Sequence, residues 1–229
     1  LGLSVEARDI YKKLQAIGAL TQADRAALFA NLIGGALWEQ ALAQYAHLIG
    51  SRDANIHDAA AGACAQLRRY DEAAAALLRA EAVSPASSRR RMLAGIYSAA
   101  GRHEDAYRLY SNLLGNGNDT ELIAATAGSA LKAGRSTEAI ALLNLLAATD
   151  PDSSGLRQLV AETAERAGDL REALKQWSVA AELQTPDGQT SHLALARIAA
   201  AAGYRTWALE QLVRLDLSRL SPAQLTGVA

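Results

Sequence analysis

The chain has little of several residue types on which common functional classes depend. Among 229 residues it has one cysteine, Cys64, four prolines and 5% aromatic residues, and its net charge is −1. A single cysteine excludes an internal disulfide and a thiolate metal cage. The near-neutral charge disfavours nucleic-acid binding, which needs many cations to neutralise phosphates. No apolar run approaches the roughly 18 residues of a membrane span, so any membrane attachment is expected from a part of the protein outside this sequence.

Alanine and leucine are abundant instead, and hydrophobic residues make up 50% of the chain. Both are strong helix formers, whereas the residues that favour strands are sparse. The composition therefore predicts an all-α fold, and the length is sufficient for a sizeable core.

One helical segment recurs along the whole chain. Aligned on a shared alanine, its copies are centred on Ala7, Ala41, Ala73, Ala106, Ala139, Ala173 and Ala208, at spacings of 34, 32, 33, 33, 34 and 35 residues. Four positions after each alanine comes a large apolar residue: Tyr11, Tyr45, Leu77, Tyr110, Leu143, Trp177 and Leu212. Residues four apart share one helical face, so the alanine permits close approach while the larger residue fills the gap. Seven copies at a near-constant period predict a solenoid.

Turn signals separate two helices within each copy. A glycine lies five residues before the aligned alanine at Gly101, Gly134, Gly168 and Gly203, where a first helix would end and the chain reverse. Asp169 with Glu172 predicts a capping box at the start of one second helix. Prolines near the ends of copies, at Pro85, Pro151 and Pro186, predict the ends of second helices.

This helix–turn–helix unit resembles the tetratricopeptide repeat (TPR). Its small first-helix position is matched by Phe29, Ala61, Ala94, Ala127, Ala161 and Ala196, and the position three later by Leu32, Cys64, Tyr97, Ala130, Ala164 and Ala199. The chain departs from the family at its early tryptophan position, which is occupied by Arg25, His57, Arg90, Ile123, Arg157 and His192. The resemblance implies a right-handed α-solenoid (superhelix) of about six repeats with partial repeats at both ends. The related pentatricopeptide repeat, an RNA reader, is disfavoured by the neutral charge.

The expected organisation is a single TPR array over residues 1–229. Full repeats are placed at 22–53, 54–86, 87–119, 120–153, 154–188 and 189–221, after a second helix from a preceding repeat at 1–21. Residues 222–229 are expected to start a further repeat, because Ser221 and Pro222 suit a helix start. The chain is therefore expected to be a piece of a longer array. Gly115 and Gly117, at a repeat junction without proline, predict its most flexible joint.

The resemblance implies that partners bind in a concave groove lined by the first helices. The candidate partner-binding residues at its groove positions are Asn55, Asp58, Ser88, Arg91, Ser98, Glu121, Lys132, Gln158, Glu162, Glu165 and Arg197. The alternative for each is an ordinary solvated helix face. The run Arg89–Arg91, with Arg68 and Arg69, is the densest positive cluster, and it suits either an acidic partner or pairing with nearby carboxylates.

No catalytic, metal or cofactor site is predicted. The four histidines are scattered over different repeats without metal-ligand spacing, and Cys64 is interpreted as a small buried hydrophobe. The sequence therefore favours a non-catalytic protein–protein interaction scaffold.

In its style of composition the array also resembles the periplasmic TPR regions of bacterial outer-membrane exopolysaccharide exporters of the Pel and cellulose type. That resemblance implies a periplasmic scaffold that recruits a polysaccharide deacetylase or hydrolase near an export pore, and polysaccharide itself is a further partner. Two alternatives stay open. One is a cytoplasmic regulatory or sensor module fused to a DNA-binding or signalling domain, and the other is a substrate-recruiting arm of a glycosyltransferase-like enzyme.

Overall fold

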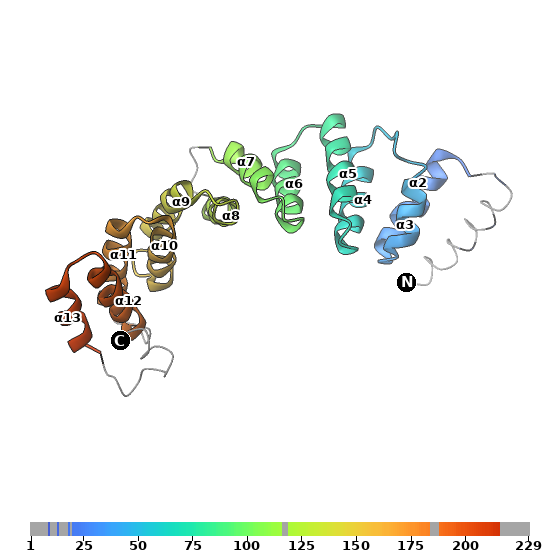
Figure 1. Cartoon of the computed structure of the whole chain (residues 1–229). Coiled ribbons are helices and arrows are strands. Elements are labelled where there is room, and N and C mark those ends of the chain that lie inside the picture. The colour runs from blue at the N-terminus through green and yellow to red at the C-terminus, as the bar shows by residue number, and fades with distance from the viewer. Residues whose placement is uncertain are drawn as a thin grey trace. The chain divides into compact units, whose positions relative to one another are not determined.

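The computed structural model describes residues 20–115, 119–183 and 188–215, with Asp9, Lys13 and Gly18 as isolated positions. This part of the chain contains 12 α-helices and no strand (Figure 1). The all-α prediction is confirmed. Most of the expected partial repeat at 1–21, all of the one at 222–229, and Gly117 of the expected joint lie outside the described residues.

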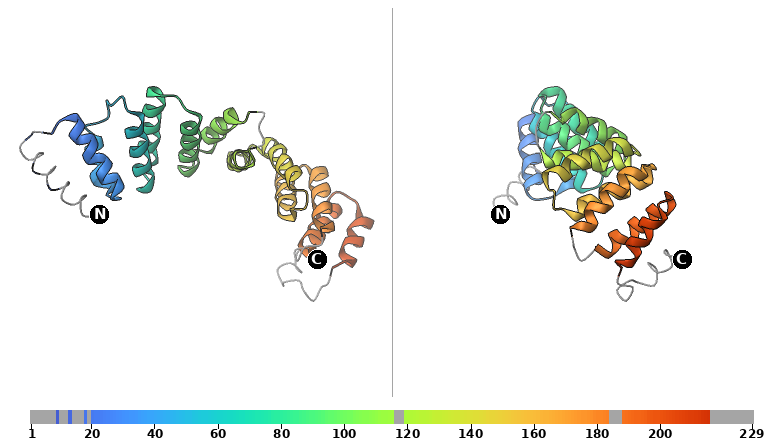
Figure 2. Two further views of the ribbon diagram at one scale, coloured as in Figure 1. Left: turned by 180° about the vertical axis from the view of Figure 1, so that it is seen from behind. Right: turned by 90° about the vertical axis from the view of Figure 1, so that its left-hand side faces the viewer.

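The chain divides into two compact units, Leu1–Gly115 and Asn116–Ala229. The helices of the first unit are α2 (Gln22–Gly34), α3 (Trp38–Tyr45), α4 (Ala54–Gln66), α5 (Tyr70–Val83), α6 (Ser87–Ala99) and α7 (His103–Leu113). Those of the second unit are α8 (Thr120–Lys132), α9 (Ser136–Thr149), α10 (Ser154–Ala167), α11 (Leu170–Glu182), α12 (Gly188–Ala201) and α13 (Arg205–Val213). Within each unit every helix contacts the next one along the chain, so the helices form stacked antiparallel pairs (Figures 1 and 2).

Small residues let the paired helices approach closely. The aligned alanines Ala41, Ala73, Ala106, Ala139, Ala173 and Ala208 are all buried, and so are the residues at the small first-helix position of all six repeats. Phe29 is the one large residue at that position; its ring is buried and lies 6.0 Å from the ring of Tyr45. The predicted core pattern is therefore observed in both units.

All six turns between a first and a second helix use a left-handed residue at the same register. Gly101, Gly134, Gly168 and Gly203 have φ values of 76° to 87°, and Ala36 and Arg68 take the same place with φ of 54° and 57°. The predicted glycine turns are thus observed. Two repeats make the turn with residues for which this conformation is strained.

The predicted capping box at Asp169 is half right. The Asp169 carboxylate accepts a hydrogen bond of 3.1 Å from the backbone N–H of Glu172. The Glu172 carboxylate instead accepts hydrogen bonds from Gln176 and Asn144, so the reciprocal half of the box is not formed. In three preceding repeats an arginine, Arg69, Arg102 or Arg135, stands at the start of the second helix and forms an ion pair with the acidic residue three positions later.

Candidate functional site

The predicted groove residues differ widely in how open they are. Six are exposed and five are half-buried. The exposed ones are Asn55, Ser88, Glu121, Lys132, Glu162 and Arg197, and the half-buried ones are Asp58, Arg91, Ser98, Gln158 and Glu165.

Four of these residues connect neighbouring first helices rather than standing free. In the first unit, Asp58 on α4 accepts hydrogen bonds of 2.8 and 2.9 Å from Nε of Arg89 on α6. In the second unit, the Gln158 amide on α10 donates to the Ser191 hydroxyl on α12 at 3.3 Å. These two contacts occupy equivalent register positions, three residues before the small position of one first helix and five before that of the next. They act as rungs that hold successive repeats together.

A third rung joins α10 to α12 nearer their C-terminal ends. Glu165 forms an ion pair with Arg197, and its other carboxylate oxygen accepts a hydrogen bond of 2.6 Å from Nε1 of the buried Trp177. Glu162 instead pairs within its own helix, with Arg166 at 3.7 Å. Some of the predicted groove residues therefore hold neighbouring repeats of the same chain together.

The predicted arginine cluster is also largely neutralised within the chain. Arg89 pairs with Asp58, Arg90 with Glu81 at 2.8 Å, and Arg69 donates from Nη2 to both carboxylate oxygens of Glu39 at 3.0 Å. These contacts support the second of the two interpretations of this cluster, pairing with nearby carboxylates.

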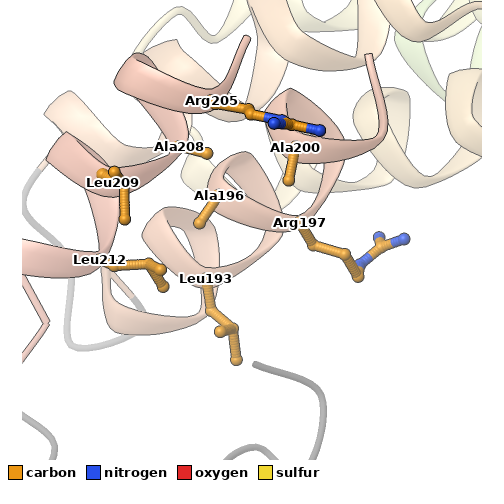
Figure 3. Close-up of a pocket in the computed structure, with 8 residues that line it drawn as sticks. All are labelled: Leu193, Ala196, Arg197, Ala200, Arg205, Ala208, Leu209 and Leu212. Carbon is orange, nitrogen blue, oxygen red and sulfur yellow. The ribbon is translucent and has the colours of Figure 1, made fainter. Parts of the chain in front are cut away.

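An open apolar hollow lies between α12 and α13. It has a volume of about 390 Å³ and is lined by Leu193, Ala196, Arg197, Ala200, Arg205, Ala208, Leu209 and Leu212. Figure 3 shows the three leucines at one end of the hollow, the alanines along its floor and the two arginines toward the other end. Among the described residues, its lining includes two guanidinium groups and no carboxylate. Of its residues only Arg197 was predicted as a partner-binding residue.

The exposure of Leu209 distinguishes this hollow from the same place in the other repeats. Leu209 follows the aligned alanine directly, and its side chain is 62% exposed. The equivalent residues are buried or half-buried in each of the other five repeats: Leu42, Ala74, Tyr107, Ile140 and Leu174. Ile140 and Leu174 pack against the core of the second unit. The register position of Leu209 is therefore at least partly buried in the other five described repeats and is open in the hollow between α12 and α13.

Polar side chains stand at the family's early tryptophan position in five of the six repeats, and Arg157, His192 and His57 are hydrogen-bonded there. Arg157 on α10 donates to the Gln176 side chain on α11 at 3.2 Å, and His192 on α12 lies 2.9 Å from the Gln211 side chain on α13. His57 is held between the Tyr45 hydroxyl at 2.7 Å and the Ser51 carbonyl at 3.0 Å.

The buried glutamines were missed by the sequence analysis, although a signal exists. Gln176 and Gln211 each lie 19 residues after their partner. The same spacing relates Arg25 to the buried Gln44 in the first repeat, where Arg25 Nη1 and Gln44 Oε1 are buried without a hydrogen bond.

Two side chains with shifted pKa values, Cys64 and Glu172, have surroundings that suit a structural role. Burial is the main cause that raises the pKa of the Cys64 thiol to about 11, and repulsion from Glu72 adds to it. A thiol with this pKa is a poor nucleophile at neutral pH. Burial also disfavours the charged form of Glu172, but hydrogen bonds from Gln176 and Asn144 outweigh it and hold the pKa of that carboxyl below its ordinary value. In the described part of the chain, no three His, Cys, Asp or Glu side chains are grouped so that they could hold a metal ion.

Among the helices that the structure describes, none is long and apolar enough to cross a membrane.

Solved structures with the same course of helices include several repeat proteins. YrrB, described as a TPR protein with an unusual peptide-binding site, is 18% identical, with a TM-score of 0.54 over 72% of this chain and 85% of its own. MamA from Desulfovibrio magneticus RS-1 is 16% identical, with a TM-score of 0.53 over 76% of this chain and 99% of its own. MamA AMB-1 is 18% identical, with a TM-score of 0.56 over 77% and 97% of the two chains. No protein-family model and no curated protein matches the sequence. The similarity, together with the repeat pattern, shows that the chain has the fold of a TPR solenoid.

Proposed function

We propose that the protein is a non-catalytic protein–protein interaction scaffold and that the α12–α13 hollow is its partner-binding site. The observation that carries the proposal is the hollow itself. It is open and apolar, and it carries an exposed leucine at a register position that is buried or half-buried in the other five repeats that the structure describes. Exposed apolar surface of this kind marks interaction sites. YrrB, a protein of the same fold, is described as binding peptides.

The hollow favours a protein partner over a small polar molecule. Six of its eight lining residues are alanine or leucine, so most of the binding free energy would come from burying apolar side chains. The two arginines add charge selectivity at one end.

Site-specific photocrosslinking in the native host tests this assignment. A benzophenone amino acid at Leu209 is expected to trap a protein partner, because this side chain is 62% exposed inside the hollow. The matched control is Leu145 on α9, which is 48% exposed and lies outside the hollow. Adducts at Leu145 that equal those at Leu209 would show that the hollow is not the binding site.

The predicted first-helix groove is the competing surface on the same scaffold. Arg91→Glu in the first unit and Glu162→Lys in the second reverse charge on that surface. If the α12–α13 hollow is the site, both variants keep the Leu209 adduct. If they abolish it, the groove is the site instead.

We further propose that the scaffold is periplasmic and serves exopolysaccharide modification and export across the outer membrane, by recruiting a deacetylase or hydrolase. The support is the compositional resemblance to exporter arrays, including 19 arginines against four lysines. Fractionation of the native host tests the compartment: recovery in the periplasmic fraction is expected, and recovery in the cytoplasm would favour the regulatory alternative.

A further inference from the structure

Two properties of the hollow between α12 and α13 restrict what can bind there: the direction of the helices that line it and the chemistry of its side chains. Two of the rungs described above, both between α10 and α12, show how a first helix lies on its neighbour within the second unit. Gln158 meets Ser191 near the start of α10 and α12, and Glu165 meets Arg197 further along both helices. Because the two contacts follow in the same order along both helices, α10 and α12 are parallel.

On α12, apolar residues occupy the positions that carry the polar rung residues on α10. Gln158 and Glu165, which face α12 from α10, correspond in register to Leu193 and Ala200. Both of these line the hollow. An occupant of the hollow therefore meets aliphatic side chains where the preceding repeat offers an amide and a carboxylate. This favours an occupant with an apolar face.

Charge is confined to one end of the hollow. Arg197 lies in the second half of α12, and Arg205 begins α13 immediately after the turn. Figure 3 shows both guanidinium groups away from Leu193 and Leu212. Both arginines are exposed, Arg197 pairs with Glu165, and none of the described residues that line the hollow is a carboxylate. A helix that lies parallel to α12 would bring its C-terminal end, which carries the negative end of the helix dipole, next to these arginines.

We propose that the hollow binds an amphipathic α-helix of a partner protein, parallel to α12, with leucine-sized side chains facing Leu193, Leu209 and Leu212 and with a glutamate or aspartate in its last turn facing Arg205. The inference rests on the proposed function, because it assigns a partner class to the same site. Acidic residues in the last turn weaken an isolated helix. An ion pair with Arg205 would offset that cost in the complex.

The test uses the full chain and a synthetic probe. The probe is a fluorescent helical peptide of about 18 residues with leucines at i, i+3, i+4 and i+7 spacing and two glutamates in its last turn. A matched peptide carries glutamine in place of both glutamates. Fluorescence anisotropy gives the two dissociation constants.

The expected result is tighter binding of the acidic peptide, by about threefold to fivefold, the range for partly exposed ion pairs. Arg205→Gln should remove this preference and leave binding of the glutamine peptide unchanged. Leu209→Ser should weaken both peptides by about tenfold. The control is Arg214→Gln, which removes an exposed arginine of the same repeat that does not line the hollow and should change neither constant.

Equal affinity for the two peptides in the unmodified protein would overturn the inference. So would binding that appears only after deletion of residues 217–229, because the occupant would then be the chain's own end. Leu209-dependent dimerisation in sedimentation without peptide would assign the hollow to a second copy and would also overturn it. If Leu209 still crosslinks a protein in the native host while the peptides are not distinguished, the proposed function stands and the partner class is wrong.

Discussion

At the scale of single residues, position in the repeat decides what each side chain does. Cys64 occupies a first-helix position held by alanine in the last three repeats, at Ala130, Ala164 and Ala199. All four residues are buried. The Cys64 side chain therefore fills the same buried position as these alanines, with a slightly larger volume.

Cys64 is expected to be unreactive in the folded protein. Its pKa of about 11 leaves about one thiol in a thousand ionised at pH 8, and burial blocks access to it. Modification by a disulfide reagent at pH 8 should be at least about a hundredfold slower in buffer than in denaturant. Equal rates would contradict the burial of this residue.

The same pKa shift predicts a pH dependence of stability. The unfolded thiol loses its proton near pH 8.5, whereas the folded thiol keeps it to about pH 11. This stabilising contribution is therefore complete below about pH 8.5 and lost as pH rises toward 11, by up to about 1.4 kcal/mol per pH unit. Urea unfolding of the native chain and of Cys64→Ala isolates the effect, because alanine does not titrate. Parallel curves over this window would show that the thiol is not buried.

The strained turns offer a residue-scale test of the backbone. Arg68 has φ of 57° at the register where four repeats use glycine. Arg68→Gly should raise the free energy of unfolding by about 0.5–1 kcal/mol, because glycine adopts this conformation without strain. Gly134→Ala should lower it by about 1 kcal/mol, and an added Cβ there meets no atom within 4 Å, so the effect would report the backbone alone. Denaturant unfolding measures both, and a loss of stability in Arg68→Gly would contradict the assigned turn.

At the scale of elements, a polar network around the buried Gln176 fixes α9, α10 and α11 to one another. The Gln176 amide donates to Asn144 at 2.9 Å and to Glu172 at 2.8 Å, and its oxygen accepts from Arg157. The preceding repeat lacks this network, because it has Ile123 and Leu142 where this one has Arg157 and Gln176.

Breaking the network on one side should cost more than replacing the pair. Gln176→Leu should lower the free energy of unfolding by about 2–3 kcal/mol, because Arg157 and Asn144 lose a buried partner. Adding Arg157→Ile, which copies the preceding repeat, should recover part of that loss. Thermal and urea unfolding of the single and double variants measure the coupling, and simple additivity of the two changes would show that they are independent.

The helices, turns and core could be predicted from sequence because they depend on local patterns. The aligned alanines specify the close helix contacts, and Gly101, Gly134, Gly168 and Gly203 specify the turns. The rungs could not be predicted: Asp58 and Gln158 look like groove residues until Arg89 and Ser191 are placed beside them. The hollow was missed for a similar reason. Leu209 has the same sequence setting as Leu174, and only the neighbouring helices decide which of the two is covered.

At the scale of the whole molecule, the division at Gly115 predicts two independently stable pieces. Each unit has its own stacked helix pairs and its own buried core cluster. Fragments 1–115 and 116–229 should therefore each unfold cooperatively, with helical circular dichroism that sums to that of the intact chain. A fragment without helical signal would mean that its core needs the other unit.

The central claim is that this solenoid is a scaffold that binds a protein through the α12–α13 hollow. Hydrogen exchange of the full chain, alone and with the purified partner trapped at Leu209, tests it most directly. The account predicts added protection in α12 and α13, with α4 and α6 unchanged. Protection of the first-helix surface on α4 and α6, with none in α12 and α13, would contradict it.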